Sequence, residues 1–281
     1  MRFRVIPFRA AALLWTVGLL ALSSGCATPD AVTGKKVMNL YTIQEDIQLG
    51  EQVQADIMTE MKKGGVRVNA DREKTATLRD MVRRIAAVSH MPDLPYEVNL
   101  FETNIVNAAA APGGKILVFS GLYDPKIGLV RNDHELAAVI DHEVAHVTCR
   151  HTTESLTRRL PTDLLLLAGA IYAEASDKDE VAAAFGVAFI AYEGFYLPQY
   201  SRKDEAEADA VGLFYMAKAG YDPRAAPELW KRVSEKEGRA PALVRWMSSH
   251  PSHHDRHKAL EKLLPQAIAE YEAARQASPG Y

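Results

Sequence analysis

The stretch His142-Glu143-Val144-Ala145-His146 places an HExxH pattern inside a long apolar segment. On an α-helix, two residues four positions apart lie on the same face, about one turn apart. Both imidazoles can therefore bind one tetrahedral Zn²⁺, at roughly 2.0–2.1 Å each. Glu143 then lies beside the metal, where it can act as a general base for a bound water. The stretch thus predicts a helix, a zinc site and a hydrolytic reaction.

The alternative interpretation of this stretch is a surface helix with two unrelated histidines. Its neighbours argue against that, because they are apolar and predict a buried helix: Leu136, Ala137, Ala138, Val139, Ile140, Val144, Ala145 and Val147. Buried polar groups need partners, and a metal would supply one. We therefore interpret both histidines as metal ligands.

Residues 1–25 have the proportions of an export signal. Three arginines precede a short apolar run, 10–22, which is too short for a comfortable membrane span. The small residues that end at Cys26 resemble the lipobox of bacterial lipoproteins, although Ser23 replaces the usual Leu. The resemblance implies cleavage before Cys26 and its lipidation, and Ala27 then suggests sorting to the outer membrane. The alternative is an ordinary secretory signal.

Charge and cysteine content limit the function classes. The net charge is −3, and removal of the predicted signal takes away three arginines and no acidic residue, which makes it −6. This is not the balance of a nucleic-acid-binding protein. About 255 residues remain, enough for one sizeable core. Besides Cys26 only Cys149 is left, so no disulfide between unmodified cysteines is expected, and we interpret Cys149 as a small buried hydrophobe rather than a soft ligand.

Hydrophobic periodicity predicts an α+β fold that is mostly helical and has a small sheet. Helices are expected at 43–63, 73–90, 132–154, 201–219, 223–237 and 252–276, with further apolar helical stretches at 163–172 and 181–191. Strands are expected at 96–101 and 115–120, and 107–114 is expected to be a loop or a short edge segment. The predicted organisation is a signal at 1–25, a lipid-anchored tether at 26–41, a single domain at 42–276 and a tail at 277–281.

A catalytic zinc needs three protein ligands and one open position. Glu205 and Asp209 are four apart, hence on one helix face, whereas Glu207 lies about 200° around the same helix. That face could offer Glu205 to the metal and Asp209 to a ligating histidine. The same residues could equally form the acidic first turn that helices favour, and taken alone they favour that interpretation.

Together the segments resemble the HtpX/Ste24-like family of zinc metalloendopeptidases, closest to its bacterial outer-membrane lipoprotein and periplasmic quality-control branch (LoiP- or BepA-like, without tetratricopeptide repeats). The resemblance rests on Val32-Thr-Gly-Lys, Ile47-Gln-Leu-Gly50, 107–114, 135–146, 200–209 and 249–256. It implies a gluzincin-type domain in which His142, His146 and Glu205 bind one Zn²⁺. It also implies that Glu143 is the general base and that Asp209 supports a ligand.

His250, with Pro251 next to it and Arg256 six residues later, matches a further motif of this family. Its imidazole could approach the zinc either to stabilise an oxyanion or to block the water site. The nearby His253, His254 and His257 lie at the start of an expected exposed helix, where histidines are usually solvated. His250 is therefore the histidine of this segment to which we give a function.

The segment Asn107, Ala108 and Ala109 is expected to bind substrate, by pairing with an extended peptide as an added strand. The loop before Pro112 is all alanine, where the family often has a bulkier apolar residue, so we expect an altered substrate pocket.

The expected function is cleavage of unfolded or misassembled envelope proteins in the bacterial periplasm. The expected partners are these substrates and, through the lipid anchor, the outer membrane, without nucleic acid. The alternative is a latched or weakly active metal-binding lipoprotein that acts as a chaperone or scaffold, which a His250 plug would favour. A zinc hydrolase of non-peptide substrates is a third possibility.

Overall fold

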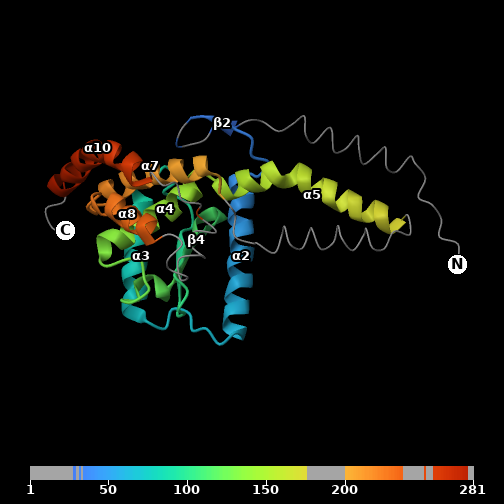
Figure 1. Ribbon diagram of the computed structural model, residues 1–281, viewed down its shortest axis with the longest axis horizontal. Coiled ribbons are helices and arrows are strands. Elements are labelled where there is room, and N and C mark those ends of the chain that lie inside the picture. The colour runs from blue at the N-terminus through green and yellow to red at the C-terminus, as the bar shows by residue number, and fades with distance from the viewer. Residues whose placement is uncertain are drawn as a thin grey trace.

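The computed structural model describes residues 28–29, 32, 34–175, 200–236, 250 and 256–277. Its elements are β1 (Thr28–Pro29), β2 (Lys36–Val37), α2 (Ile43–Lys63), α3 (Arg72–Ala87), β3 (Glu97–Phe101), β4 (Ala108–Ala111), the 3₁₀ turns Pro112–Gly114 and Ser120–Tyr123, β5 (Lys115–Phe119), α4 (Asp133–Thr148), α5 (His151–Ala175), α7 (Arg202–Lys218), α8 (Ala225–Lys236) and α10 (Arg256–Ala277). The expected mostly helical α+β class is confirmed (Figure 1).

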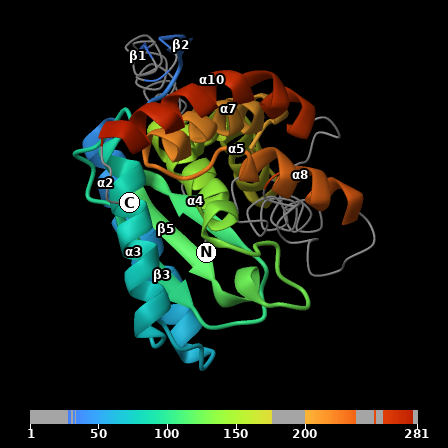
Figure 2. The same ribbon diagram turned by 90° about the vertical axis from the view of Figure 1, so that its left-hand side faces the viewer.

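A three-stranded sheet in the order β3-β5-β4 lies at the centre, with β3 parallel and β4 antiparallel to β5. Successive side chains of a strand point to opposite faces. Ile116 and Val118 of β5 therefore join the main core with α3 and α4. Leu117 and Phe119 join a smaller core with α2. Helices thus cover both faces of the sheet, as Figures 1 and 2 show.

Helix α4 runs through the interior, and residues 135–148 of it are all buried. Asn132 caps its start by accepting a hydrogen bond from the backbone N–H of Glu135. Helix α7 packs closely on α4 because Gly212 has no side chain: a Cβ there would lie 2.6 Å from the Oδ1 atom of Asp141. This close approach brings the acidic start of α7 next to the HExxH turn.

The predicted end of the motif helix, expected at 132–154, is wrong. Helix α4 stops at Thr148, and Arg150 has the left-handed φ of 57° before α5 begins at His151. A left-handed residue other than glycine is costly and needs support. The support is the Arg150 side chain, which donates hydrogen bonds to Asp46 and to the backbone carbonyl of Tyr41. Contacts with the start of α2 therefore divide the helix.

The other boundaries agree closely with expectation. Helix α2 matches 43–63, and α3 ends at Ala87 rather than at 90. The stretch 163–172 is the later part of α5, which continues through Pro161. Cys149 is buried, as expected for a small hydrophobe.

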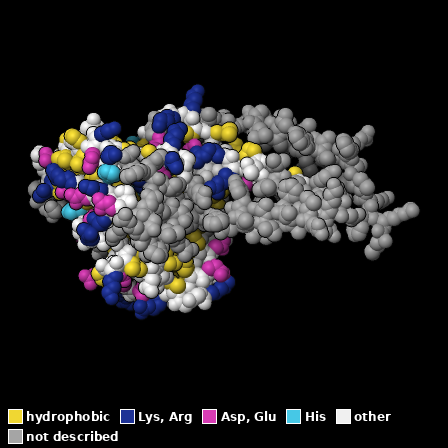
Figure 3. Space-filling view, in the orientation of Figure 1, with side chains coloured by type: hydrophobic (Ala, Val, Ile, Leu, Met, Phe, Trp, Pro, Cys, Tyr) yellow, Lys and Arg dark blue, Asp and Glu magenta, His cyan; other side chains and the backbone are white. Residues whose placement is uncertain are grey.

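The signal, Cys26 and the stretch 181–191 lie outside the described residues, so these expectations and the domain boundaries stay predictions. None of the helices within the described ranges is long and apolar enough to cross a membrane. In the view of Figure 3, acidic and basic side chains are interspersed over the described surface.

Candidate metal centre

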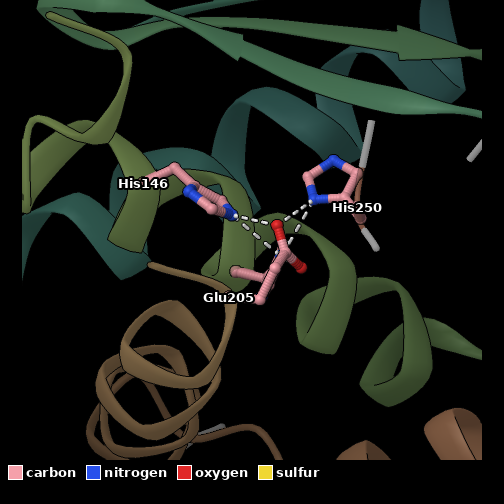
Figure 4. A group of neighbouring side chains, drawn as sticks. His146, Glu205 and His250 are labelled. Carbon is pink, nitrogen blue, oxygen red and sulfur yellow. Dashed lines mark hydrogen bonds and ion pairs between the residues drawn. The ribbon is translucent and has the colours of Figure 1, made fainter. Parts of the chain in front are cut away.

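Four buried side chains converge where α4 meets α7. His142 and His146 come from α4, Glu205 from α7, and His250 from the chain between α8 and α10. Each offers one nitrogen or oxygen, and these atoms all lie within 4.8 Å of one another. Figure 4 shows three of the side chains, with the Glu205 carboxylate between the rings of His146 and His250.

The distances between these atoms suit a tetrahedral metal. The Nε2 atoms of His142 and His146 are 3.0 Å apart, and the Nδ1 atom of His250 lies 3.2 Å from the Nε2 atom of His142. The Glu205 carboxylate lies 3.0 Å from His250 and 3.4 Å from each of the other two rings. Ligands at about 2.0–2.1 Å from a tetrahedral zinc are about 3.3 Å from one another. The donor set and its spacing therefore fit zinc.

Burial and neighbouring charge set the protonation of the cluster. Burial lowers the pKa of His146 well below 6.5, which keeps this ring in the neutral form that binds metals. Burial acts the same way on His142, but Glu205 and Asp209 outweigh it and raise the pKa of His142. Although burial raises the pKa of Glu205, the imidazoles of His250 and His142 lower it well below 4.5. Glu205 is therefore a carboxylate, as a zinc ligand must be.

Glu143 lies beside the cluster without belonging to it. It is fully buried, and within the described ranges no other side chain donates a hydrogen bond to its carboxylate. Burial raises the pKa of Glu143, with His250 the main opposing influence: its Nε2 atom lies 3.4 Å from Glu143 Oε1. A buried carboxylate with so few polar partners is costly to keep for structure alone, and it is suited to receiving a proton.

Asp209 lies beside His142, the contact that the family resemblance implies. Its Oδ1 atom lies 3.1 Å from Nδ1 of His142, the ring nitrogen that faces away from the cluster. Arg256 at the start of α10 binds Asp209 through two hydrogen bonds and lies over the ring of Trp230, 4.1 Å from its centroid. Arg256 belongs to the sequence motif of His250, which by itself predicts no role for it. Its contacts orient Asp209 and bring α10 to the site.

His146 is held by two residues whose roles the sequence analysis missed. Tyr200 stacks on its ring, with centroids 3.8 Å apart and planes inclined by 16°. The Nδ1 atoms of His146 and His151 lie 2.9 Å apart. His151 comes five residues after His146, which on an unbroken helix is about 140° around the axis. Helical spacing could not have predicted this contact, because it is the break at Arg150 that places the ring of His151 next to His146.

The segment expected to bind substrate is the edge strand β4. The Phe119 N–H donates to the carbonyl of Asn107, so in this antiparallel pair Ala109 also bonds β5, whereas Ala108 and Ala110 direct their amide groups away from it. The amide of Ala110 faces Glu143 and lowers its pKa. The outer edge of β4 therefore runs past the predicted base. Residues 108–111 are buried, at 9% exposure or less.

Comparison with known proteins adds a family and several relatives. The profile described as Peptidase family M48 matches residues 72–264. Mitochondrial metalloendopeptidase OMA1 of Schizosaccharomyces pombe is 30% identical over 245 residues, which cover 86% of this chain and 68% of the relative. The OMA1 metalloendopeptidase of Homo sapiens is 28% identical, over 84% of this chain and 44% of its own. The beta-barrel assembly-enhancing protease of Escherichia coli is 24% identical, over 84% of this chain and 47% of its own.

These relatives come from both mitochondria and bacteria, so they do not select the bacterial branch that the sequence analysis expected. The chain also spans less than half the length of the human and Escherichia coli proteins.

Proposed function

Because this chain belongs to peptidase family M48, whose members are zinc-dependent metallopeptidases, we propose that it is an endopeptidase in which His142, His146 and Glu205 hold the zinc. The observation that carries this proposal is the convergence of buried imidazole and carboxylate atoms at tetrahedral spacing beside Glu143. A buried metal with a buried free carboxylate next to it is the arrangement that metal-assisted hydrolysis requires.

The roles of the residues follow from their positions. Bound zinc supplies a Lewis acid that lowers the pKa of a water and polarises the scissile carbonyl. Glu143 takes a proton from the attacking water and passes it to the leaving amine. Its raised pKa suits both steps, because a carboxylate that binds a proton more readily is the stronger base. Asp209 holds the outer nitrogen of His142 and so directs its inner nitrogen to the metal.

The substrate is proposed to be an extended polypeptide that adds to β4. The outward N–H of Ala108 and the outward carbonyls of Ala108 and Ala110 offer backbone hydrogen bonds, which recognise any sequence that can become extended. The strand's alanines project only methyl groups, so they place little demand on the side chains of a substrate. Both features favour unfolded proteins over folded ones.

N-methylation of a peptide substrate tests this mode of binding. In an added strand, every second amide points to β4 and the intervening ones point away. Methylating one inward amide, with the scissile amide left intact, should lower kcat/KM about 2- to 12-fold, the equivalent of one net hydrogen bond. The intervening amides of the same peptide are the matched controls. If the loss of kcat/KM does not alternate between successive methylated amides, the edge-strand proposal is wrong. If the parent peptide is not cleaved in the presence of zinc, the endopeptidase proposal is wrong.

We further propose that the enzyme acts in the bacterial periplasm, anchored through Cys26 to the outer membrane, on unfolded or misassembled envelope proteins. The signal-like start and the lipobox-like sequence support this location. The Escherichia coli relative, named for enhancing beta-barrel assembly, is consistent with it. Fractionation of bacterial cells tests the anchor: Cys26→Ser should move the protein from the membrane to the soluble fraction, and a wild-type protein that is already soluble would refute it.

A second candidate function is a latched protein that keeps its metal but turns over little. Two observations favour it. The Nδ1 atom of His250 occupies the fourth corner of the cluster, and a zinc with four protein ligands has no open position for water. The edge strand β4 is also buried, so an extended peptide needs a rearrangement to reach it.

Replacement of His250 separates a latch from a catalytic role. If His250 is a latch, His250→Ala should raise kcat/KM by the reciprocal of the open fraction, about tenfold if one molecule in ten is open. His257→Ala, in the neighbouring helix, is the matched control. A loss of activity would instead assign His250 to transition-state stabilisation. An unchanged rate would mean that His250 neither blocks nor assists the reaction.

A further inference from the structure

A chain of polar side chains leads from His146 to the surface. The Nδ1 atom of His146 lies 2.9 Å from that of His151, and Nε2 of His151 lies 3.3 Å from the Oε2 atom of Glu207. Glu207 in turn accepts a hydrogen bond of 2.9 Å from Lys35. His146 and His151 are 0–1% exposed, whereas the side chain of Lys35 is 57% exposed. This row of hydrogen-bonded side chains thus runs from the interior to the solvent.

The proton positions along this chain follow from which nitrogen faces the cluster. His146 presents Nε2 to the other ligands, so that atom must be unprotonated when it binds a metal. Its proton then lies on Nδ1, which donates to Nδ1 of His151. The proton of His151 consequently lies on Nε2 and donates to the Glu207 carboxylate, which can only accept. Each hydrogen bond in the chain has one donor and one acceptor.

We propose that His151 is a positioning residue for zinc, which with Glu207 fixes the tautomer and orientation of His146. Histidine ligands commonly donate their second N–H to such a partner, and loss of that partner typically costs 10- to 100-fold in metal affinity. His142 has the equivalent partner in Asp209, so both ligands of the HExxH helix would be held from behind. The inference rests on the zinc site proposed above.

The local backbone is arranged to deliver this contact. The left-handed turn at Arg150 ends α4 and starts α5 at His151, and that turn is tied to α2 through Asp46. Glu207 lies on the opposite face of α7 from Glu205. If the acidic residues served only the first turn of the helix, the side chain of Glu207 would be exposed to solvent. Its side chain is nevertheless only 18% exposed, because it lies against His151.

Zinc affinity of the full chain, measured by competition with a chelator, tests the proposal. His151→Phe keeps a flat ring but removes both nitrogens, and should weaken zinc binding about 10- to 100-fold. His151→Gln can still accept from His146 through its oxygen and donate to Glu207 through its nitrogen, and should recover much of the loss. Glu207→Gln should give a smaller loss than His151→Phe. Lys35→Ala should change affinity only a few fold, because its ion pair is exposed.

Two measurements distinguish this role from structural support and from failure of the site itself. Thermal unfolding of the metal-free His151→Phe protein should match that of the metal-free wild type, and the visible spectrum of its Co²⁺ form should change. Unchanged affinity and spectrum would overturn the proposal, and so would a loss of affinity matched by lower stability of the metal-free protein. His146→Ala is the reference: if it binds zinc as tightly as the wild type, the proposed metal site is wrong and not merely the role of His151.

Discussion

Glu143→Gln is expected to abolish cleavage of unfolded casein while leaving the zinc content and the fold unchanged. The amide has the shape of the carboxylate but cannot accept a proton, so the loss should reach about 10²- to 10⁴-fold in kcat, the usual contribution of a general base. Zinc should stay bound because Glu143 is not among the four converging groups. The mutant should also be about as stable as the wild type, since glutamine keeps the shape of the side chain and no other side chain within the described ranges donates a hydrogen bond to the carboxylate.

The matched control is Glu228→Gln, the same chemical change at an exposed position of α8. It should cut casein at the wild-type rate. If the Glu143 variant, with full zinc, also cuts at that rate, the proposed mechanism is wrong. If it is inactive, the same variant becomes a tool: it should retain bound substrates without cutting them, and those captured from bacterial envelopes would test the proposed substrate class.

The helices could be predicted from the sequence wherever the signals that decide them are local. Helix α2 agrees because its apolar periodicity ends at Gly64, and α7 agrees because Ser201 and Asp204 form a capping box. The break between α4 and α5 could not be predicted, since neither Cys149 nor Arg150 favours a turn. It depends on hydrogen bonds from Arg150 to residues more than 100 positions earlier in the chain.

The strands themselves were also predictable, but their arrangement was not. Alternating apolar residues marked β3, and a short apolar run stopped by Gly121 marked β5, yet nothing in either strand reveals that the two run parallel and adjacent. That pairing is a property of the whole fold, in which α2 and α3 pack on opposite faces of the sheet. It matters for function, because it leaves β4 at the edge beside Glu143.

Those residues of the site could be predicted that share one helix face or belong to a family motif. The four-residue spacing indicated His142 and His146, and the resemblance added Glu205, Asp209 and His250, which the structure brings together with them. The contact with His151 depends on the break at Arg150, so it was beyond any periodicity argument. The sequence left open how His250 acts at the site, because the motif does not predict that its Nδ1 atom faces the other ligands.

Gly50→Ala is expected to be strongly destabilising although Gly50 lies outside the site. Gly50 lies in the middle of α2, where alanine would normally stabilise a helix. A Cβ at this position, however, would overlap the backbone carbonyl of Pro112, which follows the edge strand β4. Backbone cannot move aside as a flexible side chain can, so the overlap should cost about 1–3 kcal/mol of the free energy of unfolding. Because the same shift displaces β4, kcat/KM should fall as well.

Gly64→Ala at the end of the same helix is the matched control. There the added carbon would lie 3.4 Å from the nearest atom, an ordinary contact, and the φ of −73° suits alanine. Its stability should be unchanged or slightly higher. Thermal or urea unfolding measures the difference, and peptide cleavage at a temperature where both variants are folded measures the effect on β4. If Gly50→Ala is as stable and as active as Gly64→Ala, α2 does not hold the edge strand in place, and the position of β4 beside Glu143 must be set by α4 alone.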